Sequence, residues 1–149
     1  MTLGDCAACP AGCYCPMATS VPIPCLRGHY CAESTLILTP CPVGTFNPDE
    51  GMVRVEDCFD CVPGQYCGQT GLTAPDGPCD AGYYCIGKAI ISFPVSVASG
   101  SFCPAGGYCP TGSEKSTSCV SGKYNPNTRK RDAAGCVDCL AGFYCSGAN

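Results

Sequence analysis

The chain has 149 residues, including 18 Cys, 19 Gly and 14 Pro but no Trp, and its formal net charge is −4. A cysteine content this high is typical of a disulfide scaffold, whereas Gly and Pro at this level disfavour long helices. The lack of a basic surplus argues against a nucleic-acid partner, and no apolar run is long enough for a membrane span.

A seven-residue pattern, Cys-x-x-Gly-x-Tyr-Cys, recurs along the chain and is called the motif. Its glycine predicts a tight turn with positive φ, and its tyrosine ring is placed to cover a neighbouring disulfide. Six copies have both cysteines: Cys9–Cys15, Cys25–Cys31, Cys61–Cys67, Cys79–Cys85, Cys103–Cys109 and Cys139–Cys145.

Two further copies, Cys41–Asn47 and Cys119–Asn125, end in Asn instead of the second Cys. Each is followed by a Cys-x-x-Cys pair, and these pairs begin at Cys58 and at Cys136, 78 residues apart. The same spacing relates the flanking cysteines, which indicates an internal duplication.

The repetition predicts three segments. Residues 1–40 form a partial repeat, 41–102 form a repeat with an apolar insertion at 86–102, and 103–149 form a repeat that is truncated or continues into a neighbour. We expect a small disulfide-rich fold of β-hairpins and turns, stacked into an elongated rod with little or no helix.

The two equivalent loops favour the disulfides Cys41–Cys58 and Cys119–Cys136. For the other cysteines two schemes remain open, because pairing does not follow from sequence alone. Either each motif closes on itself, or neighbouring motifs interlock. Cys13 has no counterpart in the other motifs, and a Cys6–Cys13 pair would leave no cysteine unpaired. The cysteines with open partners are Cys6, Cys9, Cys13, Cys15, Cys25, Cys31, Cys61, Cys67, Cys79, Cys85, Cys103, Cys109, Cys139 and Cys145.

The runs 41–67 and 119–145 resemble the cysteine-rich repeats of ephrin-receptor-like and tumour-necrosis-factor-receptor-like modules. Long arrays of this type are similar to those on protist surfaces and flagellar appendages. The resemblance implies that the first loop closes on its own pair, which supports Cys41–Cys58. It also implies crossed pairing of the next cysteines, as Cys61–Cys79 and Cys67–Cys85, and it implies no ligand.

Two segments are candidate assembly contacts. Apolar residues in the insertion alternate as in a strand, which predicts either a loop folded over its own module or an exposed edge strand that pairs with a neighbour. The loop at 125–135 is basic where its counterpart at 47–57 is acidic, so the two could attract successive units head to tail or bind an acidic glycan. The candidate residues are Ile90, Ile91, Phe93, Val95, Val97, Arg129, Lys130 and Arg131.

No catalytic, metal or cofactor site is predicted. The Cys-x-x-Cys pairs each lead into a motif, which favours disulfides over zinc, and His29 has no patterned nucleophile. The chain has no Asn-x-Ser/Thr sequon, so any glycans are expected to be O-linked. Residues 1–5 lack the features of a signal peptide, although the cysteines indicate an oxidising compartment, so we expect a piece of a longer secreted or cell-surface protein.

These features predict a non-enzymatic, extracellular structural protein that forms or extends a cell-surface filament or appendage, through self-association or neighbouring repeats. The alternative is a ligand-binding or stalk module of a receptor ectodomain. A transmembrane helix and a cytoplasmic domain in the full gene would favour the receptor, and further repeat periods would favour the filament.

Overall fold

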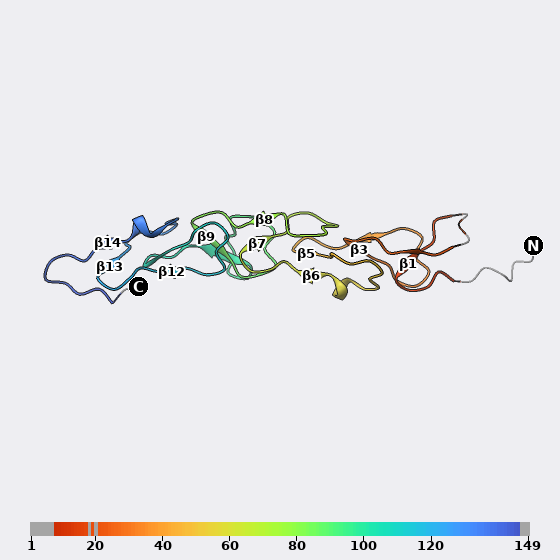
Figure 1. Ribbon diagram of the computed structural model, residues 1–149, viewed down its shortest axis with the longest axis horizontal. Helices are drawn as coiled ribbons and strands as arrows, with labels where there is room; N and C mark the ends of the chain where they lie inside the picture. The colour runs from red at the N-terminus through yellow and green to blue at the C-terminus, as the bar shows by residue number, and fades with distance from the viewer. Residues whose placement is uncertain (1–7, 18, 20, 147–149) are drawn as a thin grey trace, which may run out of the picture. The chain divides into compact units, whose positions relative to one another are not determined.

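The structure is a computed structural model, which describes residues 8–17, 19 and 21–146. Within this part of the chain the regular structure consists of short antiparallel two-stranded hairpins and two single-turn 3-10 helices (Figure 1). The predicted class, a disulfide-rich fold of repeated hairpins with little helix, is confirmed. The stacking of these hairpins into a rod stays a prediction.

Every hairpin is built in the same way. Its first strand contains the fifth and sixth residues of a motif, and its second strand ends directly before the first cysteine of the next motif. The pairs are β1 (Cys13–Tyr14) with β2 (Ile23–Pro24), β3 (His29–Tyr30) with β4 (Thr39–Pro40), β5 (Thr45–Phe46) with β6 (Phe59–Asp60), β7 (Gln65–Tyr66) with β8 (Gly77–Pro78), β9 (Tyr83–Cys85) with β10 (Gly100–Phe102), β11 (Gly107–Tyr108) with β12 (Thr117–Ser118), and β13 (Lys123–Tyr124) with β14 (Val137–Asp138).

The turn inside each motif follows from its residue types. In the motif that begins at Cys61, the amide of Gln65 donates to the carbonyl of Val62 at 3.1 Å. Gly64, at the third position of this turn, has φ +80°, and Pro63 stands before it. Pro followed by a residue with positive φ is the signature of a type II turn, as the sequence predicted.

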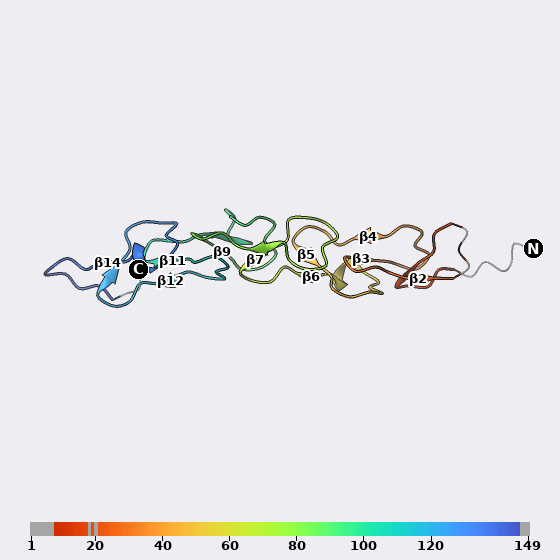
Figure 2. The same cartoon turned by 45° about the horizontal axis from the view of Figure 1, so that its top comes forward.

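Two compact units make up the chain. The first comprises Met1–Asp60 with Gln69–Ala74, and the second comprises Cys61–Gly68 with Pro75–Asn149. In the first, β5 and β6 lie side by side in both ribbon views (Figures 1 and 2). These units reflect spatial contacts, whereas the three predicted segments describe repetition of sequence and stay a prediction.

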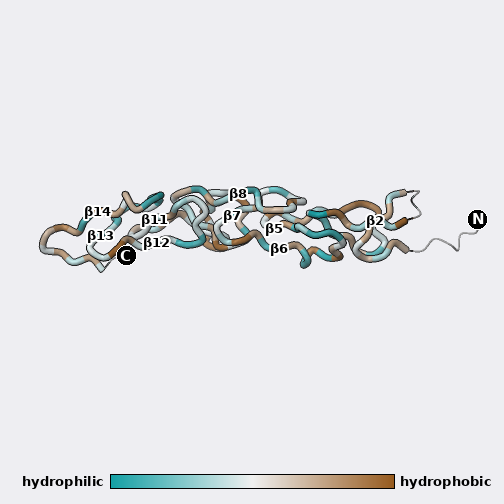
Figure 3. Tube along the Cα trace, viewed as in Figure 1, coloured by the Kyte–Doolittle hydropathy of each residue, from teal (hydrophilic) through white to brown (hydrophobic). Residues whose placement is uncertain are grey.

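Half-cystines make up most of the buried core. Among the described residues, the buried apolar side chains other than the half-cystines are those of Ala89 and Pro94. Hydrophilic and hydrophobic residues follow one another at short intervals along the traced chain (Figure 3). Large apolar side chains such as Ile37 and Leu140 are exposed. Burial of aliphatic side chains therefore contributes little, and cross-links have to restrict the unfolded chain instead.

The apolar insertion is a loop and not a strand between residues 86 and 99. After β9 the chain folds back over its own unit, where Ser92 accepts a hydrogen bond from the amide of Asp80 at 2.7 Å. Ala89 and Pro94 are buried in it. Of the two alternatives for the insertion, the structure has the loop folded over its own module. Residues 93–97 form no strand, because the Pro94 ring is buried and proline has no amide hydrogen for a ladder.

Candidate functional site

The disulfides follow the local scheme. Cα atoms of the paired cysteines lie 5.8–6.3 Å apart, within the usual reach of a disulfide. The crossed pairs Cys61–Cys79 and Cys67–Cys85 are absent, because each motif turn already brings its own two cysteines together. The eight disulfides are Cys9–Cys15, Cys25–Cys31, Cys41–Cys58, Cys61–Cys67, Cys79–Cys85, Cys103–Cys109, Cys119–Cys136 and Cys139–Cys145.

The pairs Cys41–Cys58 and Cys119–Cys136 are the two that the sequence analysis favoured. Cys13 forms no disulfide within the described residues, and Cys6, its expected partner, lies outside them. Disulfides on this scale indicate an extracellular or secreted protein.

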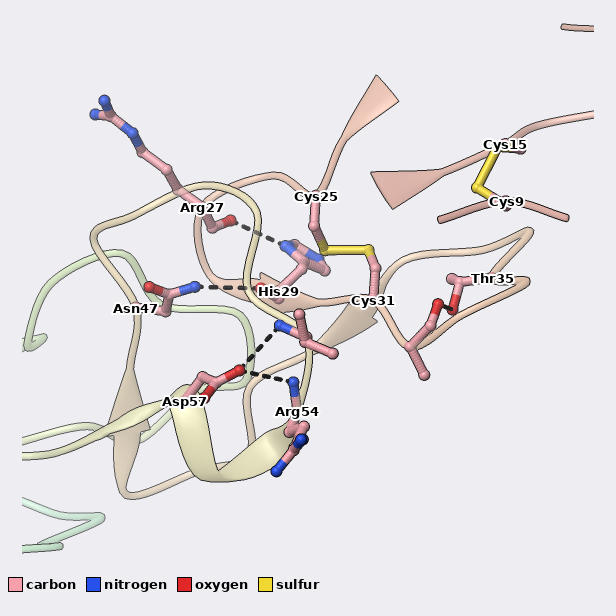
Figure 4. The surroundings of a disulfide bond; sticks show 12 residues. Cys9, Cys15, Cys25, Arg27, His29, Cys31, Thr35, Asn47, Arg54 and Asp57 are labelled. Atoms are coloured by element: carbon pink, nitrogen blue, oxygen red, sulfur yellow. Dashed lines mark hydrogen bonds between the residues drawn. A yellow bond between two sulfur atoms is a disulfide. The ribbon is translucent and has the colours of Figure 1, made fainter. Parts of the chain in front are cut away.

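Buried asparagines replace the second cysteine in the two variant motifs. Asn47 donates from Nδ2 to the carbonyl of His29 at 3.2 Å and accepts at Oδ1 from the amide of Asp49 at 3.0 Å (Figure 4). Asn125 makes the equivalent bonds, to the carbonyl of Gly107 at 2.6 Å and from the amide of Asn127 at 3.0 Å. A polar side chain thus fixes the motif end where a disulfide does so elsewhere.

Within each of the two units, successive motifs are joined through the backbone of the motif glycine. Its amide donates to the carbonyl of the last residue of the next motif, and its carbonyl accepts from the amide of that motif's first cysteine. Gly12, for example, donates to Cys31 at 2.9 Å and accepts from Cys25 at 2.8 Å. The glycines that make both bonds are Gly12, Gly28, Gly64, Gly82, Gly106 and Gly122.

A second pair of hydrogen bonds links each motif to the segment beyond the next one. A residue with φ between 51° and 79°, called the left-handed residue, follows the next motif and donates its amide to the carbonyl of the first cysteine. The carbonyl after it accepts from the amide of the motif's last residue. These six left-handed residues are Ser34, Gly51, Gly71, Lys88, Gly112 and Arg129.

The left-handed residue also lies against the motif glycine two motifs earlier in the chain. The carbonyl oxygen of Gly51 lies 2.6 Å from the position of a β-carbon added to Gly12, and the carbonyl of Gly112 lies 2.5 Å from the same position on Gly64. Gly71 covers Gly28 in the same manner. Three successive motifs are therefore interlocked by backbone atoms alone, with no space for a side chain at Gly12, Gly28 or Gly64.

Two groups of predicted contact residues meet in the second unit. The ring of Phe93 contacts that of Tyr83 edge to face, with centroids 6.3 Å apart. The guanidinium of Arg129 lies 5.8 Å from the Tyr83 centroid and 5.3 Å from that of Phe102. Such cation–π contacts contribute about 0.5–1 kcal/mol at an exposed site. Tyr83 was not predicted, because it lies in sequence outside both candidate segments. Phe102 is the last residue of the insertion 86–102 but was not among the predicted contact residues.

The remaining predicted contact residues are an exposed apolar group and a basic pair. Val95 and Val97 are 72% and 83% exposed, and Ile90 and Ile91 are also exposed. Lys130 and Arg131 line a shallow surface depression of about 430 Å³ together with Arg129, Asp132, Ala134 and Gly135. We call the set Phe93, Phe102, Arg129, Lys130 and Arg131 the aromatic–basic surface.

The two duplicated loops differ in how their 3-10 helices are capped. In η1 (Val55–Asp57), Oδ2 of Asp57 accepts from the amides of Arg54 and Val53, each at 2.9 Å (Figure 4). These hydrogen bonds hold the pKa of Asp57 below its ordinary value, and the bond from the amide of Arg54 has the largest effect. In η2 (Ala133–Gly135), Asp132 instead accepts from the amide of Ala134 at 3.0 Å.

Nothing in the described ranges 8–17, 19 and 21–146 groups three or more His, Cys, Asp or Glu side chains for a metal ion. Nδ1 of His29 donates to the carbonyl of Arg27, 3.0 Å away (Figure 4). Asp138 forms an ion pair across the hairpin with Lys123 at 2.6 Å, and this exposed pair contributes at most about 1 kcal/mol to stability.

No helix within the described residues 8–17, 19 and 21–146 is long and apolar enough to cross a bilayer.

No protein-family model matches the chain, and no curated protein matches its sequence.

Proposed function

We propose that this chain is an extracellular structural protein whose repeats form or extend a cell-surface filament or appendage. The observation that carries the proposal is the interlock between successive motifs. It uses backbone donors and acceptors and a glycine without a side chain, so the same joint recurs whatever residues occupy the loops. A joint that is independent of loop sequence suits an array in which repeats are added one after another.

The closed motifs also suit a structural protein outside the cell. Each motif is closed either by its own disulfide or by a buried asparagine with a longer disulfide loop. Cross-links of these loop lengths stabilise a fold by about 2–3 kcal/mol each through the entropy of the unfolded chain. Short connections between them leave few extended segments for a protease to bind.

Antibodies raised against the purified chain test this role by immunogold electron microscopy of unpermeabilised native cells. We expect gold particles in rows along extracellular filaments or appendages. Labelling that is confined to the plasma membrane, without an associated filament, would support a receptor ectodomain instead. Labelling that appears only after permeabilisation would contradict both roles.

The aromatic–basic surface favours a second candidate, a module that binds an acidic glycan or an acidic protein segment. Three adjacent basic residues, Arg129, Lys130 and Arg131, stand beside exposed apolar side chains, a combination that offers both charge and stacking to a sugar. Retention on immobilised heparin tests it. The double variant Lys130→Ser/Arg131→Ser should elute at lower salt than Lys115→Ser/Lys88→Ser, which removes the same charge, and equal elution would contradict the candidate.

A further inference from the structure

We propose that the basic loop 125–135 binds a carboxylate of an acidic protein segment, at the position where the duplicated loop 47–57 holds its own Asp57. The inference deepens the second candidate function, on which it rests, and names its ligand class. It is carried by the comparison of two loops that share their backbone hydrogen bonds and differ in their side chains.

The same hydrogen bonds hold the backbones of the two loops. The amide of left-handed Gly51 donates to the carbonyl of Cys25, and that of Arg129 donates to the carbonyl of Cys103, in each case at 2.8 Å. The amide of the last residue of each 3-10 helix donates to the carbonyl of the residue that caps its start, at 3.1 Å in η1 and 3.2 Å in η2. Each position of the first loop therefore has its counterpart 78 residues later.

Asp57 shows which group this backbone binds in the first loop. Its Oδ2 accepts from the amides of Val53 and Arg54, each at 2.9 Å (Figure 4). The same two hydrogen bonds hold the pKa of Asp57 below its ordinary value, so they favour the ionised carboxylate. Two adjacent amides thus form a carboxylate site that the loop fills with its own side chain.

The second loop has the two donors without the acceptor. The donors are the amides of Arg131 and Asp132, which have no hydrogen-bond partner among the described residues, although they lie well inside the described range 21–146. The counterpart of the acceptor is Gly135, which has no side chain to reach them. The stem of Lys130 lies against Gly135 instead, with Cγ 2.8 Å from the position of an added β-carbon.

Positive charge replaces the internal carboxylate in the second loop. The surface depression of about 430 Å³ at this position is lined by Arg129, Lys130 and Arg131. The residues at the corresponding positions of the first loop, 51–53, are uncharged. Asp132 is the single carboxylate in this lining, and its Oδ1 is already bonded to an amide of η2. The cations therefore attract an external anion to the two free amides.

The first loop also indicates the class of ligand. The group that its two amides hold is an aspartate carboxylate, with one oxygen accepting both hydrogen bonds. An Asp or Glu side chain of another protein offers the same group, and further acidic residues beside it would meet the cations of the depression. Because exposed charge pairs contribute little, we expect weak binding, with half-saturation at about 1–10 mM.

An NMR titration of the oxidised chain with acetylated and amidated tetra-aspartate, at constant ionic strength, tests the site. We expect the amide resonances of Arg131 and Asp132 to shift with saturation, whereas those of Val53 and Arg54, which Asp57 already occupies, stay in place. Binding of the peptide without these shifts, or no binding, would overturn the inference. A heparin-derived hexasaccharide that binds the same amides more tightly than the peptide would overturn the assignment to an acidic protein segment.

The variant Gly135→Asp supplies the missing carboxylate from within the chain. Gly135 does not have a positive φ, and the atoms that its new side chain would meet belong to the flexible stem of Lys130. We expect the half-saturation concentration of the peptide to rise about tenfold or more. Ala134→Glu is the matched control, because it adds the same charge at the position of Glu56 without filling the site, and it should cause a smaller rise. An equal rise in the two variants would overturn the amide site.

The variant Arg131→Val tests the same site without new packing against Lys130, because it copies the first loop at an exposed position. It should raise the half-saturation concentration about threefold or more, since one of the attracting charges is lost. Unchanged binding of the peptide would overturn the inference.

These outcomes separate the ligand class from the candidate function. If the peptide shifts neither amide while Lys130→Ser/Arg131→Ser still elutes from heparin at lower salt than its control, the inference is wrong and the candidate function stands. If both experiments give no effect, the candidate function fails as well.

Discussion

The carbonyl oxygen of Arg129 lies 2.8 Å from the position that a β-carbon on Gly82 would occupy, although the two residues are 47 positions apart in sequence. The turn alone requires positive φ at Gly82, which Asn also tolerates. The close approach of Arg129 removes that freedom. Gly82 therefore meets two requirements, one from the turn within its own motif and one from the interlock with a later motif.

A pair of alanine substitutions separates these two requirements. Gly82→Ala and Gly122→Ala introduce the same strain at φ +91° and +86°, but no described atom lies within 4 Å of the added methyl at Gly122. The strain alone should cost about 1–2 kcal/mol of unfolding free energy in both variants. Gly82→Ala should lose a further 1 kcal/mol or more, at about the cost of overpacking, in urea unfolding of the oxidised chain. Equal losses would show that the Arg129 approach contributes nothing.

The buried asparagines should be as important as cross-links. Asn125→Ala removes both side-chain hydrogen bonds and leaves the carbonyl of Gly107 and the amide of Asn127 without those partners. Each unsatisfied group costs about 1–3 kcal/mol, so thermal unfolding should move to a clearly lower temperature. Asn127→Ala is the matched control, because its backbone amide makes the bond and its side chain is exposed. A control variant as unstable as Asn125→Ala would contradict the assigned role.

Asp57 should make the stability of the first unit depend on pH in the acidic range. Its folded-state pKa is lowered by the amides of Arg54 and Val53, so its contribution is present above the ordinary pKa of 3.8 and is lost as the pH falls through the lower folded value. The difference in stability between the parent and Asp57→Ala should be constant at neutral pH and should vanish in strong acid.

The control is Glu56→Ala, which removes the neighbouring carboxylate of the same 3-10 helix. The hydrogen bonds from the amides of Val53 and Arg54 go to Asp57, so Glu56→Ala should lose less stability than Asp57→Ala at neutral pH. If the two variants lose the same stability, the hydrogen bonds at the start of η1 are not the cause.

Local features could be predicted from the sequence where neighbouring residues determine them. Pro63 and Gly64 fix a turn within four residues, and that turn brings Cys61 to Cys67, so hairpins and short disulfide loops follow from the motif. Crossed pairing, implied by resemblance to receptor modules, is wrong because the motif turn leaves each cysteine beside its own partner.

Features that join distant segments could not be predicted. Left-handed Ser34, Lys88 and Arg129 have side chains that usually avoid this conformation, and hydrogen bonds to a distant motif contribute to stabilising it. The contact between Arg129 and Phe102 depends likewise on the fold of two loops. The alternation of Phe93, Val95 and Val97 indicated a strand, but burial of Pro94 outweighs that pattern.

Disulfides, and not an apolar interior, hold the motifs in their fold. Amide hydrogen exchange, measured by mass spectrometry before and after full reduction at neutral pH without denaturant, tests it most directly. We predict that the amides of the motif glycines and first cysteines, protected in the oxidised chain, exchange at unfolded rates once the chain is reduced. A fully reduced chain that keeps these amides protected would contradict the claim.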